Sequence, residues 1–170
     1  MTTPIRAALV PHSSLVALVR SGLRAVQREH LSLLDDGIRA SFADSLDLDK
    51  ALQKGHEREN RWDYLLGHEE SDQVVGLEPH SAQNHEVSTV IKKRAMALEQ
   101  LRGHLKPGAR VADWFWVASG KVDFLPIEKA HARLASNGIR FVGTRLLKKY
   151  LPETAISPNG RKTGGKKPKG

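Results

Sequence analysis

The sequence predicts an α/β protein whose mixed β-sheet is flanked by helices. Three observations support this class. Strand-like and helix-like stretches alternate along the chain, which is typical of a layered α/β fold. Residues 61–77 read as two strands joined by a polar turn. Residues 110–118 are apolar on both faces apart from Asp113, as expected of a strand that helices cover on both sides.

For residues 13–54 the sequence predicts a helix, a strand and a second helix. Residues 13–35 carry apolar side chains at helical spacing, so we expect one long amphipathic helix there. Gly37 ends that helix, and the alternating residues 38–42 predict the first strand. Residues 45–54 begin with a serine and carry leucines at 46, 48 and 52, which predicts a short helix. An Asp-x-Asp metal site at Asp47 and Asp49 is disfavoured because side chains two apart on a helix diverge.

The stretch from Arg61 to Leu77 predicts an antiparallel hairpin. Its first strand runs to Gly67, five polar residues follow, and a compact apolar run covers residues 73–77. Glu78 and His80 are two residues apart, so they share one face if the strand continues. With Asp63 on the neighbouring strand, these residues form an arrangement that can hold a divalent metal ion beside a phosphodiester.

A second main helix is expected to open between Ser81 and Asn84. Turning 100° per residue places one apolar arc on it, made of Val87, Val90, Ile91, Ala95, Leu98, Leu101 and Leu105. Arg94 falls within this arc. It either reaches Asp63, Glu78 or a phosphate, or it snorkels or pairs with a structural acid such as Asp113. Lys93 points outward unless a one-residue distortion at the helix start turns it inward.

The C-terminal part predicts four further elements before the tail. They are an edge strand at 121–125, a helix at 126–137, a last strand at 139–143 and a short basic helix at 144–150. Residues 1–150 therefore read as one domain, and residues 151–170, rich in Gly, Lys and Pro, as a basic disordered tail.

The helix, the strand that begins near Asp63, the strand that ends in Glu78-Pro79-His80 and the helix that follows resemble the PD-(D/E)XK nuclease-like superfamily over residues 14–117. That family has an αβββαβ core, and His80 stands where its motif has lysine. The resemblance implies a magnesium-dependent nuclease in which Asp63 and Glu78 hold the metal, with the Pro79 carbonyl as a further ligand. His80 would orient water or neutralise charge. Glu29 is a further metal ligand on this reading, or else a solvated helix residue.

Charge points to nucleic acid as the partner. The net charge is +8, but residues 157–170 hold five basic residues and no acid, which leaves +3 for the rest of the chain. Lys93, Arg94, Lys162, Lys166 and Lys167 are the candidate nucleic-acid contacts, and the tail cations predict attraction to any polyanion without sequence readout.

Several classes lack support in the sequence. The absence of cysteine excludes disulfides, thiolate catalysis and Cys-ligated zinc. The eight histidines are dispersed, and phosphate-loop, dinucleotide-binding and nucleophile-elbow motifs are missing. No stretch reads as a membrane span or a secretory signal, so we expect a cytoplasmic protein.

Three functional hypotheses remain open at this stage. The chain is a metal-dependent nuclease, or a catalytically degenerate member of the same fold that binds nucleic acid or a protein partner. In the third hypothesis Asp63, Glu78 and His80 form only a structural polar cluster. A homo-oligomer is also left open.

Overall fold

The computed structural model describes residues 2–123 and 127–154. The α-helices in these ranges are α1 (Pro4–Ala8), α2 (Leu48–Leu52), α3 (Glu86–Leu101) and α4 (Ile127–Ser136). The 3-10 helices are η1 (Val16–Leu18), η2 (Arg28–Leu33), η3 (Asp36–Ser41) and η4 (Lys148–Tyr150). The strands are β1 (Arg20–Ser21), β2 (Phe42–Asp47), β3 (Tyr64–His68), β4 (Gln73–Gln83), β5 (Val111–Asp123) and β6 (Ile139–Phe141).

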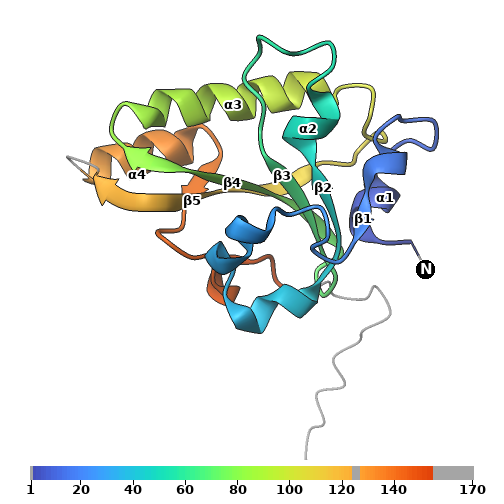
Figure 1. Cartoon of the computed structure of the whole chain (residues 1–170), viewed down its shortest axis with the longest axis horizontal. Helices are drawn as coiled ribbons and strands as arrows, with labels where there is room; N and C mark the ends of the chain where they lie inside the picture. The colour runs from blue at the N-terminus through green and yellow to red at the C-terminus, as the bar shows by residue number, and fades with distance from the viewer. Residues whose placement is uncertain (1, 124–126, 155–170) are drawn as a thin grey trace, which may run out of the picture.

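These strands form one mixed sheet in the order β1-β2-β3-β4-β5-β6 (Figure 1). The first four strands pair antiparallel with their neighbours, whereas β4 with β5 and β5 with β6 pair parallel. Parallel neighbours need a crossover connection, and α3 and α4 lie in the two crossovers. The predicted α/β class with a mixed sheet flanked by helices is therefore confirmed.

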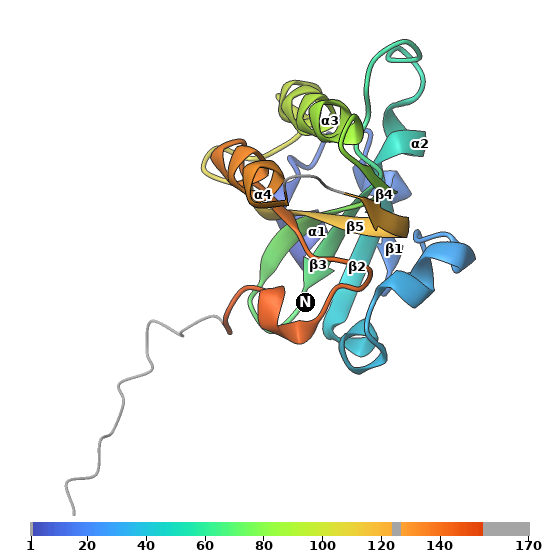
Figure 2. The same cartoon turned by 90° about the vertical axis from the view of Figure 1, so that its left-hand side faces the viewer.

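The two faces of the sheet are covered differently. Figure 2 shows α3 and α4 together over one face, and the segments that contain η2, η3 and η4 lie on the opposite side. The core under α3 and α4 contains Trp62, Trp114 and Trp116, and the opposite core contains Tyr64, Phe115 and Leu146. Alternating residues of the buried strands supply the two cores, as the two-residue period of a strand requires.

The helix predicted over residues 13–35 is wrong. The segment contains η1, β1 and η2 separated by turns, with Gly22 at φ +56°. Its leucines and valines serve both cores, since Leu15 and Val19 pack on the α3 side while Val26 and Leu34 pack on the other. A straight helix presents its apolar stripe to one surface only, so it cannot wrap around the sheet edge in this way.

The next two elements begin and end differently from the prediction. The strand expected at residues 38–42 is mostly η3, and β2 begins at Phe42. The helix expected over residues 45–54 shortens to α2, because the residues up to Asp47 pair in β2. Asp47 then caps α2 by accepting a hydrogen bond from the Lys50 N–H at 2.9 Å.

The predicted hairpin is confirmed as β3 and β4, but β4 and β5 are both longer than expected. Beyond the sheet body β4 continues to pair with β5, with Ala82 opposite Val122 and Gln83 opposite Asp123. β5 therefore continues through Ser119 and Gly120, and residues 121–123 belong to β5 rather than to a separate edge strand. Residues 124 and 125 of that predicted strand lie outside the described residues.

The C-terminal elements follow the prediction more closely. The predicted helix at residues 126–137 is α4, and the last strand is β6, which ends at Phe141. The basic helix predicted at residues 144–150 shrinks to the single turn of η4. The tail predicted to be disordered lies outside the described residues from position 155 onward. No helix in the described part of the chain is both long and apolar enough to cross a membrane.

Gly76 and Pro79 shape the central strand β4. A Cβ at Gly76 would lie 2.7 Å from Trp114 Cε3 and 2.9 Å from Trp62 Nε1, so only glycine lets these two rings meet over β4. Pro79 lies beyond Leu77, the last β4 residue that pairs with β3. β4 therefore tolerates the missing Pro79 N–H at a point where only β5 still pairs with it.

Candidate active site at the start of β3

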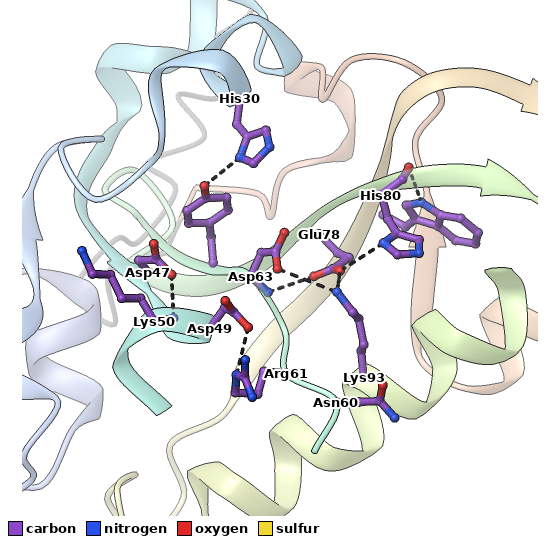
Figure 3. Close-up of polar contacts among 12 residues, drawn as sticks. His30, Asp47, Asp49, Lys50, Asn60, Arg61, Asp63, Glu78, His80 and Lys93 are labelled. Atoms are coloured by element: carbon purple, nitrogen blue, oxygen red, sulfur yellow. Dashed lines mark hydrogen bonds and ion pairs between the residues drawn. The ribbon is translucent and has the colours of Figure 1, made fainter. Parts of the chain in front are cut away.

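Asp63, Glu78 and Lys93 converge between the start of β3, the middle of β4 and the inner face of α3 (Figure 3). Tyr64 pairs with Leu77, which brings the residue before β3 beside Glu78. The backbone N–H of Asp63 donates to Glu78 Oε2 at 2.8 Å. Lys93 Nζ donates to Glu78 Oε1 and lies 3.8 Å from Asp63 Oδ1. Two carboxylates thus share one ammonium group.

This cluster is buried most deeply at Glu78. The Glu78 side chain is 0% exposed, whereas those of Lys93 and Asp63 are 16% and 24% exposed. Burial, together with the nearby Asp63 charge, raises the pKa of Glu78 to about 8. Burial also raises the pKa of Asp63, against the opposing effect of Lys93. Burial disfavours the charge on Lys93, but Glu78 and Asp63 outweigh it and raise the Lys93 pKa.

His80 lies beside this cluster and is held by Glu86. The His80 and Glu78 side chains share one face of β4, as predicted, with His80 Nδ1 at 3.8 Å from Glu78 Oε1. The other ring nitrogen, Nε2, lies 2.7 Å from Glu86 Oε2 at the start of α3. The indole N–H of Trp116 donates to the His80 carbonyl at 3.2 Å. The hydrogen bond from His80 lowers the pKa of Glu86. His80 therefore joins the buried cluster to a more accessible carboxylate.

The start of α2, which carries Asp47 and Asp49, contacts the backbone of Asp63. The N–H groups of Leu48 and Asp49 point at the Asp63 carbonyl, at 2.8 and 3.3 Å, so the start of α2 fixes the backbone at Asp63. Arg61 Nε donates to Asp49 Oδ1 at 2.9 Å and neutralises that carboxylate. The metal reading that the sequence disfavoured for Asp47 and Asp49 finds no support, because Asp47 caps α2 and Asp49 binds Arg61.

Lys93 and Arg94 occupy positions that differ from the helical prediction. Ala95 is exposed and Leu98 is 44% exposed, whereas Val90 and Ala97 are buried. The buried arc is therefore rotated toward Lys93, which lies three residues after Val90 and four before Ala97. The alternative in which Lys93 turns inward is the correct one.

Arg94 is not part of the cluster. Its guanidinium lies over the Trp114 ring, with Cζ at 5.7 Å from the ring centroid. Its expected contacts to Asp63, Glu78 or Asp113 do not occur within the described ranges. Three other predicted nucleic-acid contacts, Lys162, Lys166 and Lys167, lie outside the described residues.

Glu29 does not join Asp63 and Glu78. It lies on η2 rather than on a long first helix. Burial raises the pKa of Tyr64, and the charge of Glu29 adds a smaller contribution. Its neighbour His30 is closer to the site, with Nδ1 at 2.7 Å from the Tyr64 hydroxyl. The prediction of a first-helix metal ligand fails because that helix does not form.

Sequence reasoning also missed Glu86 and the ion pair between Arg61 and Asp49. Glu86 lies six residues after His80 across a turn, and no strand or helix period links the two. The Arg61 and Asp49 pair joins a loop to α2, so only the folded chain brings it together.

The donor set in this cluster fits a hard divalent cation. Asp63 and Glu78 offer carboxylate oxygens, and Mg²⁺ is commonly held by one or two carboxylates with water completing its shell. The described residues contain no group of three or more His, Cys, Asp or Glu side chains arranged to hold a metal. A metal here would therefore depend on two carboxylates, backbone oxygen and water.

Comparisons with protein-family models, with curated proteins and with solved structures found no match to this chain.

Proposed function

We propose that the protein is a magnesium-dependent nuclease that hydrolyses phosphodiester bonds of DNA or RNA. The convergence of Asp63, Glu78 and Lys93 is the observation that carries this proposal. Two adjacent carboxylates suit a divalent cation, and a neighbouring ammonium suits the negative charge of a phosphate in the transition state.

The resemblance to the PD-(D/E)XK superfamily gains support from the order of elements. Three consecutive antiparallel strands, β2, β3 and β4, are followed by α3 and by a parallel strand, β5. The motif departs from the family at His80, where a lysine is expected. Lys93 supplies the missing cation from α3, since its ammonium reaches the same glutamate.

Each residue then has a defined role. Asp63 and Glu78 would hold the cation, with the Pro79 carbonyl nearby in sequence as a further oxygen donor. When bound, Mg²⁺ supplies positive charge to the phosphate and lowers the pKa of bound water. Lys93 neutralises charge on the scissile phosphate, and the Glu86 carboxylate fixes the orientation of the His80 ring.

A cleavage assay on single- and double-stranded DNA and RNA tests this proposal. The wild type, Asp63→Asn and the control Asp72→Asn are compared with Mg²⁺ and with EDTA. Asp72 is an exposed turn residue at φ +55°, a conformation that asparagine adopts readily. We expect metal-dependent cleavage that falls by roughly 100-fold or more in Asp63→Asn and persists in the control. Equal cleavage by Asp63→Asn and wild type would exclude this site as the catalyst.

A second candidate function is nucleic-acid binding without cleavage by the same fold. It is favoured by the complete burial of Glu78, whose two oxygens are already engaged by Lys93 and by the Asp63 N–H. In that case no substrate is cleaved with any divalent metal, and binding of the same oligonucleotides is unchanged by EDTA. The two functions are therefore distinguished by the same set of proteins.

A further inference from the structure

A cavity lies away from the candidate active site, at the beginning of β5 and β6 beneath the C-terminal half of α3. Its volume is about 630 Å³, and neither Asp63, Glu78 nor Lys93 lines it. The lining combines apolar residues with four charged residues: Arg94, Arg110, Arg140 and Asp113.

Arg94 is the most unusual residue of this cavity. Its guanidinium packs on Trp114 and against Gly138, where a Cβ would lie only 2.6 Å from Arg94 Nη2. Gly138 has φ +71°, so the chain places a residue without a side chain where the guanidinium needs room. The Nε atom of Arg94 is buried and has no hydrogen-bond partner in the described part of the chain.

A guanidinium in this position is costly without an anion. Burial lowers the pKa of Arg94, and among the described residues no carboxylate forms an ion pair with it. The cavity's one acid, Asp113, has a pKa that burial raises, although Arg140 and Arg110 oppose the shift. The Arg140 guanidinium packs over the Tyr150 ring, with Cζ at 4.7 Å from the ring centroid, and Tyr150 does not line the cavity. Arg94 and Arg110 against one weakened acid leave the cavity positive, which favours an anionic ligand.

The chemistry of the lining selects the kind of anion. Arginine presents a planar fork of donors that suits phosphate oxygens, and Trp114 holds that fork in place from below. The remaining wall is apolar, with Leu98 44% exposed and Leu105 beside it. A cavity with one anchored charge and an apolar wall fits a ligand that joins a charged group to a flat apolar body.

We propose that this cavity binds the phosphate group of a nucleotide, with Arg94 as the anchoring residue and the apolar wall against the nucleoside. The nucleotide is either free or the 5′-phosphorylated end of a nucleic acid, which present the same phosphate ester. This inference does not depend on cleavage at Asp63 and Glu78, since it concerns a separate set of side chains.

Titration calorimetry on the full chain in EDTA tests the proposal, because EDTA removes any contribution from metal-dependent cleavage. The probes are inorganic phosphate, adenosine monophosphate, citrate, and one oligonucleotide with either a 5′-phosphate or a 5′-hydroxyl.

The variants are Arg94→Met, Ala135→Glu, and the control Arg102→Met. Ala135 is an exposed residue that lines the cavity, so glutamate there places a competing anion beside Arg94. Arg102 is a highly exposed arginine just after α3 that pairs with Glu99.

We expect adenosine monophosphate to bind the wild type, and its affinity to fall by roughly tenfold or more in Arg94→Met and in Ala135→Glu but not in Arg102→Met. Stronger binding of the 5′-phosphorylated oligonucleotide than of its 5′-hydroxyl form identifies a nucleic-acid end. Equal binding of the two forms identifies a free nucleotide. The proposal is overturned by no nucleotide binding up to about 10 mM, by equal losses in Arg94→Met and Arg102→Met, or by binding of citrate without phosphate. Should Arg94→Met not fold, Ala135→Glu alone carries the same comparison with the control.

Discussion

Glu78 sets the electrostatics of the site at the scale of single residues. It is fully buried, it touches the only described ammonium in the cluster, and Asp63 adds a second negative charge. Two like charges in a dry environment resist simultaneous ionisation, and the raised Glu78 pKa is the result. Removing its charge therefore changes stability in a pH-dependent way.

Glu78→Gln is expected to gain stability relative to wild type as pH rises. The folded protein keeps a proton on Glu78 up to about pH 8, whereas the unfolded chain loses it near the ordinary glutamate pKa of 4.5. Between these values the folded state binds more protons, so wild-type stability falls with increasing pH, by up to about 1.4 kcal/mol per pH unit. Urea unfolding of both proteins in EDTA at pH 5 and pH 8 measures this. Parallel pH profiles for the two proteins would show that Glu78 has an ordinary pKa.

The neighbouring lysines 92 and 93 provide a matched pair for the next prediction. Lys92 is exposed, whereas Lys93 binds the buried Glu78. At pH 9, where Glu78 is ionised, Lys93→Met leaves a buried carboxylate without its cation and should cost about 1 to 3 kcal/mol. Lys92→Met should change the free energy of unfolding by no more than about 0.5 kcal/mol. Equal effects of the two substitutions, measured by urea unfolding, would mean that α3 does not present Lys93 to Glu78.

At the scale of elements, a buried carboxylate outside α1 anchors that helix. Thr3 gives α1 no side-chain cap, but Asp44 of β2 accepts the N–H of Ile5 at 3.0 Å and of Arg6 at 3.3 Å. Asp44 is 0% exposed, so water cannot replace these N–H groups as the hydrogen-bond donors to its oxygens. Helix α1 is thus held on the sheet through its own free N–H groups.

Asp44→Ala should therefore destabilise the protein by about 1 to 3 kcal/mol, because the buried Ile5 N–H and the partly buried Arg6 N–H lose their acceptor. Asp36→Ala serves as the control, since Asp36 pairs with Arg39 at the surface, where its side chain is 87% exposed. Thermal or urea unfolding decides between them. A loss from Asp44→Ala no larger than that of the control would contradict the anchoring role.

Strands inside the sheet could be predicted from the sequence, whereas the segment that wraps around the sheet edge could not. The β3–β4 hairpin is confirmed, and β5 forms where it was predicted but continues to Asp123. Residues 13–35 carry apolar side chains for both cores, so their spacing imitated a helix. Asp63 and Glu78 are neighbours, as the strand pattern predicted. The inward position of Lys93 could not be predicted from the apolar arc alone. It depends on how α3 is rotated, and in the folded chain Lys93 contacts the buried Glu78 carboxylate of β4.

At the scale of the whole molecule, charge is divided between the domain and the tail. Residues 155–170 hold five of the basic residues and no acid, and the remaining chain has a net charge of +3. The neighbourhood of the site is rich in acids, with Asp47, Asp49, Asp63, Glu78 and Glu86 all close to it. Attraction to a nucleic acid therefore has to come mainly from elsewhere on the chain.

Deleting residues 155–170 should leave the fold unchanged and weaken non-specific DNA binding. Because five cations are removed, the slope of log K against log salt should decrease in magnitude by roughly 4 units. Binding isotherms at several salt concentrations, with a melting curve as the control for folding, measure this. An unchanged salt slope would place the DNA contacts on the domain instead.

The most direct test of the central claim is magnesium binding by calorimetry on the wild type, Asp63→Asn and Asp72→Asn. The account predicts one Mg²⁺ site in the wild type and in Asp72→Asn, and its loss in Asp63→Asn, because two carboxylates and water are the expected shell. A wild-type protein that binds no magnesium, or an Asp63→Asn protein that binds it with unchanged affinity, would contradict the assignment of Asp63, Glu78 and Lys93 as a metal-dependent active site.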